Sequence, residues 1–201
     1  MSTIGLRGFC IIALLLSAPQ VVAEFARGVT AYNAGDYVNA AVEFLIAAQK
    51  GDVRAQLNLG LLYDQGQGVE QDYAQAVMWY TRAAQGGDAM AQANLAAMYF
   101  DGLGVEQDDK KAAQWYLKAA QAGNPIAQYN LGVLYGEGIG LESDPVQSYV
   151  WLEIAAQNGE QVTEQERAAL IEQLDNGQLE NAKTLIDTYS KSIPTWRQTT
   201  D

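Results

Sequence analysis

The side chains of this chain that could carry out chemistry are carboxylates and tryptophans. It contains 24 Asp and Glu residues, no histidine and one cysteine. Ten of the acids gather in three short segments: Asp64, Glu70, Asp72, Asp101, Glu106, Asp108, Asp109, Glu137, Glu142 and Asp144. Such a row could steer a basic partner or hold calcium weakly. However, the last Asp of each segment can be explained as a helix cap, and charged loops are usually just solvated. We therefore expect no metal site here.

Catalysis would have to rest on carboxylate pairs such as Asp108 with Asp109. Neighbours at a helix start are poorly placed for glycoside hydrolysis, because its two carboxyls must face each other across a cleft. The lack of histidine removes the commonest general base, and a single cysteine excludes an intrachain disulfide and cysteine-ligated zinc. We therefore predict no catalytic residue, no metal and no cofactor. Trp79, Trp115 and Trp151 could form a sugar platform, but their constant 36-residue spacing favours stacking in the core.

The charge balance also restricts the class of partner. Twelve Lys and Arg stand against 24 acids, so the formal net charge is -12. A strongly acidic chain repels phosphate backbones, and we expect no nucleic-acid partner. The hydrophobic fraction of 49% is ample for a folded core.

Residues 1–23 have the three parts of a secretory signal peptide. Arg7 supplies positive charge, residues 9–18 form the apolar run, and Ala23 ends a segment that a signal peptidase could read. We predict cleavage after Ala23 and a periplasmic or secreted product. The alternative is an uncleaved anchor, but about ten apolar residues fall short of the roughly 20 that span a bilayer. The lone Cys10 leaves with the signal, and we expect no stable membrane anchor afterwards.

The rest of the chain repeats itself every 36 residues. An Ala-Gln-x-Asn-Leu phrase begins at residues 55, 91 and 127, and each of the three tryptophans is followed by an Ala-Ala pair. Between them lies a glycine-rich phrase, at residues 66–72, 102–108 and 138–144. Its glycines permit positive φ angles, its single Val or Leu can tuck under the turn, and its last residue, Asp, can cap the following helix. Each unit is predicted to be a helix, a seven-residue loop, a helix and a tight turn.

Both helices of a unit carry one apolar stripe. In the first unit the stripes are Ala55, Leu59, Leu62 and Tyr63, and then Ala76, Tyr80, Ala83 and Ala84. Gly60 lets a neighbouring helix approach closely. Since an isolated helix pair cannot bury two stripes, the units must stack. The sequence predicts an all-α protein, an α-solenoid of helix pairs.

These motifs resemble Sel1-like repeats, the longer-looped relatives of tetratricopeptide repeats. The first helix pair, in which Gly35-Asp36-Tyr37 turns the chain directly, is closer to the tetratricopeptide form. The resemblance implies an adaptor, and exported bacterial members are associated with envelope assembly, sensor-kinase regulation and host contact. Some secreted members pair a disulfide in each repeat and have been linked to β-lactam binding. That chemistry is not carried over, because the processed chain has no cysteine.

The predicted organisation has seven segments. They are a signal peptide at 1–23, a tetratricopeptide-like helix pair at 24–52, three Sel1-like repeats at 53–88, 89–124 and 125–159, capping helices at 160–190, and a tail at 191–201. A capping box from Thr163 to Glu166 opens the first capping helix, expected to reach about Leu174. Residues 175–177 should break it, and a second helix should run over 178–190. In the tail, Ile193 and Trp196 are candidates for packing back on the repeats.

Partner binding is predicted on the face that the stripes leave free in the first helix of each repeat, which should line the concave wall of the solenoid. We call this set the first-helix column: Arg54, Leu57, Leu61 and Asp64; Met90, Ala93, Ala97 and Phe100; Ile126, Tyr129, Val133 and Gly136. It is apolar for a surface, which indicates a groove for a peptide segment with Met90, Phe100 and Tyr129 as anchors. The alternative is that strong curvature closes the groove and these side chains pack together.

The function predicted from the sequence is an exported, monomeric adaptor or scaffold that binds a protein or peptide and is not an enzyme. Two alternatives stay open. A cell-envelope glycan (peptidoglycan) binder or weak hydrolase would need exposed tryptophan rings or facing carboxylates in the groove. The function of a purely structural spacer would not be affected by substitutions in the groove.

Overall fold

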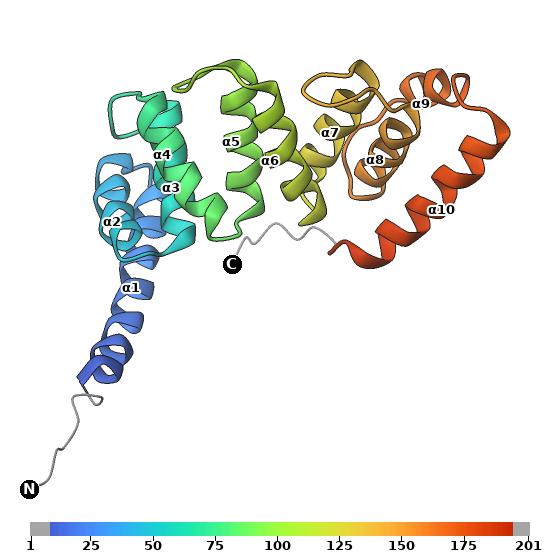
Figure 1. The fold of residues 1–201 in the computed structure, drawn as a ribbon. Helices are drawn as coiled ribbons and strands as arrows, with labels where there is room; N and C mark the ends of the chain where they lie inside the picture. The colour runs from blue at the N-terminus through green and yellow to red at the C-terminus, as the bar shows by residue number, and fades with distance from the viewer. Residues whose placement is uncertain (1–8, 195–201) are drawn as a thin grey trace, which may run out of the picture. The chain divides into compact units, whose positions relative to one another are not determined.

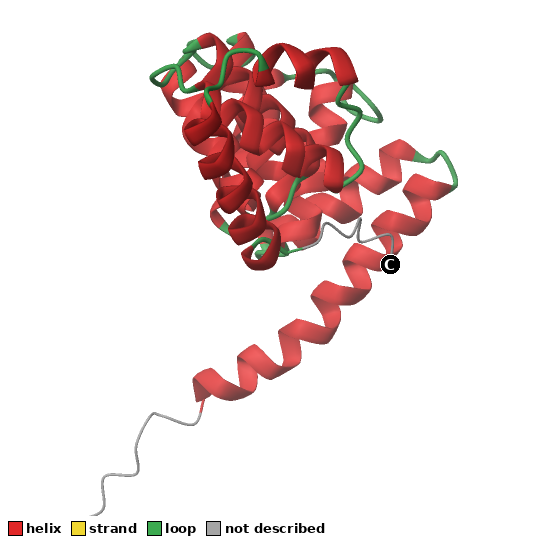
Figure 2. Ribbon diagram, turned by 90° about the vertical axis from the view of Figure 1, so that its right-hand side faces the viewer, coloured by secondary structure: helices red, strands yellow, loops and turns green. Residues whose placement is uncertain are grey.

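A computed structural model describes residues 9–194, with side chains from residue 20 onward. Every regular element within that range is a helix, as Figure 2 shows. Trp196 and the charged start of the signal segment lie outside the described residues. The chain divides into two compact units, Met1–Gly86 and Gly87–Asp201.

The first unit contains four helices, each packed on the next. They are α1 (Phe9–Asn33), α2 (Tyr37–Gln49), α3 (Val53–Gln65) and α4 (Tyr73–Gln85). Contacts join α1 to α2, α2 to α3 and α3 to α4, the succession visible in blue to green in Figure 1. α1 continues without a break through the predicted cleavage position after Ala23.

The second unit contains six helices. They are α5 (Ala89–Asp101), α6 (Asp109–Gln121), α7 (Pro125–Glu137), α8 (Pro145–Gln157), α9 (Glu164–Ile171) and α10 (Asn176–Ser192). α5 to α8 pack in chain order, and both α9 and α10 pack against α8, as Figure 1 shows. Stacked helix pairs closed by terminal helices are the predicted α-solenoid with a helical cap, and the fold class is confirmed.

The repeated polar residues act at the helix ends as predicted. The loops that join α3 to α4, α5 to α6 and α7 to α8 each contain seven residues. Asp72, Asp108 and Asp144 close these loops, and their carboxylates accept backbone N–H groups from the first turn of the next helix. This satisfies donors that have no partner within the helix.

The loop glycines do more than permit positive φ. Gly68 and Gly140 both have a φ angle of 71°. In addition, a methyl group on Gly68 would overlap backbone atoms of Tyr37 at the start of α2, and one on Gly140 would overlap those of Asp109 at the start of α6. Each loop therefore lies directly on the first turn of the preceding second helix. The glycines ensure close packing between successive repeats as well as the turn.

The stripes are buried as expected. Ala55, Leu59 and Leu62 are at most 1% exposed, and Tyr80 is fully buried. A methyl group on Gly60 would stand 2.6 Å from the ring of Tyr80, so this glycine sets the spacing between α3 and α4.

The glutamine of the Ala-Gln phrase joins one repeat to the next. Gln56 Nε2 donates to the carbonyl oxygen of Ala48 at 3.1 Å, and Gln128 Nε2 donates to that of Ala120 at 3.1 Å. Both carbonyls belong to the last turn of the preceding helix, where they also accept the backbone N–H of Gly51 and of Gly123. Gln128, which is fully buried, also accepts a hydrogen bond from Asn158 Nδ2 at 2.9 Å.

The capping helices differ from the prediction at their boundary. α9 ends at Ile171 rather than near Leu174, and α10 begins at Asn176, so the break falls at 172–175. Asp175 accepts the backbone N–H of Gln178, whose side chain accepts the N–H of Asp175 in return. This reciprocal cap allows a glycine in the first turn of the helix, where the sequence pattern indicated a break. At its other end α10 extends to Ser192, into the predicted tail.

Candidate functional site

In the first unit, the first-helix column follows α3. The Arg54 guanidinium lies 3.0 Å from the carboxylate of Asp52 and 4.1 Å above the ring of Phe25. Leu57 and Leu61 are half-buried. Asp64 accepts a hydrogen bond from the hydroxyl of the buried Tyr80 at 3.0 Å. On α3 the column therefore begins with the charged Arg54, continues with two leucines and ends with Asp64, which is hydrogen-bonded to a core tyrosine.

In the second unit, the column follows α5 and α7. Ala93 is 6% exposed and offers little surface, whereas Met90, Ala97 and Phe100 are half-buried. Phe100 packs against the hydrophobic core of this unit. On α7, Val133 is half-buried, Gly136 is exposed and Ile126 is 56% exposed.

Tyr129 is tied to the cap. Its hydroxyl donates to Glu166 Oε1 on α9 at 3.0 Å, and this hydrogen bond, with some burial, raises the pKa of Tyr129. Hydrogen bonds from Thr163, reinforced by the one from Tyr129, lower the pKa of the Glu166 carboxyl. The sequence predicts Tyr129 as an anchor for a partner, and the structure adds a hydrogen bond from its hydroxyl to the capping helix α9.

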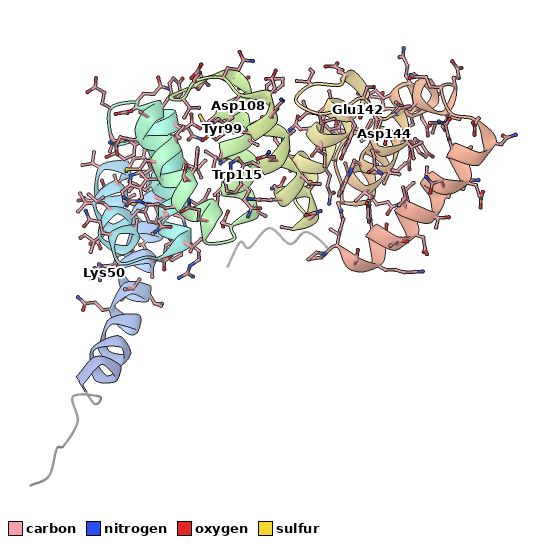
Figure 3. All side chains as sticks on the ribbon, viewed as in Figure 1. Lys50, Tyr99, Asp108, Trp115, Glu142 and Asp144 are labelled. Atoms are coloured by element: carbon pink, nitrogen blue, oxygen red, sulfur yellow. The ribbon has the colours of Figure 1, made fainter. Side chains whose placement is uncertain are left out.

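The last loop residue of each acidic segment, Asp72, Asp108 or Asp144, caps the next helix. The pKa of Asp108 is lowered by the backbone N–H of Lys111 and by the Lys111 ammonium, whose Nζ lies 3.1 Å from Oδ2. Figure 3 labels Asp108, Glu142 and Asp144 at the loops that precede α6 and α8. Within residues 9–194, no three metal-ligating side chains come close enough together to hold an ion. Nearby, burial and the charge of Asp101 raise the pKa of Tyr116 to about 12.

The three repeat tryptophans lie in or against the core. Trp79 and Trp151 are 4% and 2% exposed, and Trp115, labelled in Figure 3, is half-buried. Each ring has a partner over one face. The Arg82 guanidinium lies 4.5 Å from the Trp79 ring, Lys118 Nζ lies 4.0 Å from the Trp115 ring, and Tyr189 stacks on Trp151 at 5.2 Å. This arrangement is typical of packing and does not present three open rings to a sugar.

The second unit also has a small cavity of about 230 Å³ between α6, α7 and the loop that follows α7. Leu117, Leu131 and Leu141 line it. None of the first-helix column residues contributes to its wall, so it is separate from the predicted binding face.

Sequence reasoning missed an ion pair in the first unit. Lys50 Nζ, labelled at the end of α2 in Figure 3, lies 2.6 Å and 2.7 Å from the two carboxylate oxygens of Glu24. Glu24 is 3% exposed. The two residues are 26 positions apart and fall outside the repeated phrases, so no local pattern pointed to them.

Comparison with known proteins identifies the family. The Sel1 repeat model matches residues 53–88, 89–124 and 125–160. The crystal structure of a Sel1 repeat protein from Oxalobacter formigenes is 26% identical, with a TM-score of 0.67 over 87% of this chain and 74% of that one. A protective antigen of uropathogenic Escherichia coli strains, displaying an SLR fold, is 29% identical, with a TM-score of 0.51 over 88% of this chain and 47% of that one. No curated protein matches. With three consecutive repeats covering more than half of its residues, the chain belongs to the Sel1 repeat family.

Proposed function

We propose that this protein is an exported adaptor that binds a partner protein or peptide through the first-helix column. Sel1 repeat solenoids are generally protein-interaction scaffolds and are typically not enzymes. Within the described residues, no helix has the length and apolar character needed to cross a bilayer. The column supplies the binding residues, and the rest of each repeat supplies a rigid frame for them.

The observation that carries the proposal is the exposure of Ile126. Only five large hydrophobic side chains are exposed in the described part of the chain, and this one, 56% exposed, belongs to the column. Tyr129 and Val133 follow it at intervals of three and four residues, and both are half-buried. An exposed aliphatic side chain in line with half-buried neighbours is a suitable anchor point for a helix or extended peptide.

Within the proposal, the exposure of each column residue suggests a different role for it. Ile126 becomes the main anchor on α7, because the Tyr129 hydroxyl is already bound to Glu166. On α5, the column residues Met90 and Phe100 are half-buried, so each offers part of its side chain to a partner. On α3, Arg54 offers a cation that a partner's carboxylate could approach, since its side chain is 52% exposed.

Export of the chain rests on the sequence of residues 1–23, and the packing of α1 is compatible with it. Val22 is 55% exposed and Ala23 is exposed, whereas Glu24 is the first fully buried side chain among those described. Val21 packs against the hydrophobic cluster of the first unit, so the predicted cleavage after Ala23 would remove that contact, but it would keep the Glu24 to Lys50 ion pair.

A matched pair of substitutions tests the binding face. Ile126→Glu places a charge in the column, and Ile171→Glu places the same charge on α9, at a side chain that is 41% exposed and outside the column. In-cell crosslinking followed by pull-down should capture a partner with the parent protein and with Ile171→Glu, but not with Ile126→Glu. Retention of the same partner by all three would contradict binding through the column, provided that circular dichroism shows equal helicity.

Export has its own test. The mass of the protein purified from a cell-envelope fraction should correspond to a chain that begins at Glu24. A product that keeps residues 1–23 and stays in the cytoplasmic fraction would contradict the export proposal. It would leave the proposed binding face unaffected.

A further inference from the structure

The second helices of the repeats can be compared position by position. α2, α4, α6 and α8 each begin one residue after an Asp N-cap and carry an Ala-Ala pair at the same place, so residues 36 apart are equivalent. We use the term outer column for the second, sixth and tenth residues of these helices. It consists of Val38, Val42 and Ile46 in α2, Ala74, Met78 and Arg82 in α4, Lys110, Gln114 and Lys118 in α6, and Val146, Val150 and Ile154 in α8.

In α6 no other described helix covers the outer column, and its residues face the solvent. In α6 its three residues are polar and exposed, which is the expected state of a solvent-facing position. The helices at the two ends of the series differ from α6: α2 and α8 both have Val, Val and Ile at these three positions.

In α8 the apolar outer column is covered by α10. Val146, Val150 and Ile154 are 9%, 0% and 1% exposed, and they share one hydrophobic cluster with Ala182 of α10. Ile186 and Tyr189 of α10, and Ile193 directly after it, pack against the same cluster. Lys183 and Asp187 of α10 are exposed. An amphipathic helix is thus the cover that this chain itself places on a Val-Val-Ile column.

In α2 the same three residues have no such cover. Val38 and Val42 are 62% and 51% exposed, and Ile46 is half-buried. Among the described elements, α2 packs chiefly on α1 and α3, through the opposite side that contains the buried Phe44. Two of the five exposed large hydrophobic side chains in the described range therefore lie one helical turn apart on this surface.

We propose that the outer column of α2 is a docking site for an amphipathic helix of a partner protein, with an apolar stripe built like that of α10. This surface is distinct from the first-helix column, and the proposal does not depend on it. A second copy of this chain is a poorer occupant. Three partly exposed side chains from each copy would bury far less than the roughly 1,200 Å² of a stable interface. A helix as long as α10 would also contact the flanks of α2.

The flank of the column specifies one feature of the partner. Where α8 has Trp151 under Tyr189, α2 has Glu43, which pairs with Arg27 at 2.8 Å and keeps 24% of its side chain exposed. A partner helix would thus place a polar side chain where α10 has Tyr189. Because the chain carries 24 acids against 12 bases, a cationic side chain is favoured there.

The test uses a labelled synthetic peptide of residues 175–194 that carries Tyr189→Lys, titrated into the purified protein by fluorescence anisotropy. We expect a dissociation constant of about 1 to 100 µM, typical of one helix on an open apolar face. Val42→Glu and Val38→Glu should each weaken binding by about tenfold or more. Gln114→Glu, at the same register of α6, should leave binding unchanged. Both valines are more than half exposed, so the variants should keep the parent's helicity.

Three outcomes would overturn the proposal. The first is no binding to the parent protein at about 1 mM peptide. The second is equal binding to the parent and to both valine variants, which would mean that the peptide displaces α10 from α8. The third is a parent protein that sediments as a dimer and that Val42→Glu converts to a monomer, since the occupant would then be a second copy. Ile126→Glu should not alter peptide binding, which separates this site from the first-helix column.

Discussion

Substitution of the second loop glycine tests how the repeats contact each other. Gly138 and Gly140 lie in the same loop with φ angles of 70° and 71°, so an alanine at either position carries the same left-handed strain of roughly 1 to 2 kcal/mol. Their surroundings differ. The nearest atom to a methyl group on Gly138 would be Ser143 Cβ at 3.3 Å, a contact that a small shift relieves. A methyl group on Gly140 would overlap the Asp109 carbonyl group and stand 3.0 Å from the Lys110 nitrogen.

Gly140→Ala should therefore destabilise the protein more than Gly138→Ala. The loop must move off the first turn of α6, and overpacking of this kind costs about 1 to 3 kcal/mol beyond the shared strain. Leu141, which packs against the core next to this glycine, would move with the loop. We expect total losses of roughly 1 to 2 kcal/mol for Gly138→Ala and roughly 2 to 5 kcal/mol for Gly140→Ala.

The assay is urea unfolding followed by circular dichroism, together with amide hydrogen exchange at the first turn of α6. Gly140→Ala should lower the unfolding midpoint further than Gly138→Ala and should speed exchange at Lys111 and Ala112. Equal midpoints for the two variants, with unchanged exchange in α6, would refute the inference that the loop lies directly on the preceding repeat.

Three further predictions concern other contacts of the repeats and the capping helices. Gln128→Ala should cost about 1 to 3 kcal/mol in chemical unfolding, because it removes two hydrogen bonds of a buried amide, to the Ala120 carbonyl and from Asn158 Nδ2. Tyr189→Ala should uncover the Trp151 ring, shift its fluorescence to the red and lower stability by about 2 to 4 kcal/mol. The pKa of Glu166 is lowered in the folded state, so its stabilising effect is present above the ordinary value of 4.5 and is lost as the pH falls through the folded pKa. Acid titration should therefore loosen α9, and Glu166→Gln should flatten that dependence.

Each of these predictions has a control. Gln147→Ala removes an amide of the same kind at a half-buried position on α8 and should cost less than Gln128→Ala. Lys183→Ala changes the exposed side of α10 and should leave Trp151 fluorescence as it is. Unchanged exchange in α9 between pH 6 and 3 in the parent protein would contradict the role given to Glu166.

Most of the local structure follows from short-range chemistry, which is why the sequence predicts it well. The Asp caps, the seven-residue loops and the buried stripe of Ala55, Leu59 and Leu62 depend on neighbouring residues and on helical periodicity. The predicted boundary between α9 and α10 is wrong, because two local signals compete there. The sequence of residues 175–177 indicates a break, but the reciprocal bonds between Asp175 and Gln178 stabilise a first helical turn instead.

Site residues were harder to predict, because exposure depends on distant parts of the chain. Ala93 and Tyr129 occupy the same register position, the second member of the first-helix column in α5 and in α7. Yet Ala93 is buried, and Tyr129 is bound to Glu166, 37 residues away. Ile126 was one member of the column among twelve, and only its 56% exposure singles it out.

By itself, the sequence determined the repeat length, the all-helical class, the Sel1 family and the absence of histidine chemistry, because these depend on composition and on patterns within about 36 residues. Only the tertiary structure decided which apolar side chains are covered. Val38 and Val146 are the same residue at the same repeat position, and one is 62% exposed while the other is 9% exposed. The physical reason is that burial is a property of the helix packed opposite, and here that helix is α10, about 30 residues further along the chain than the column it covers.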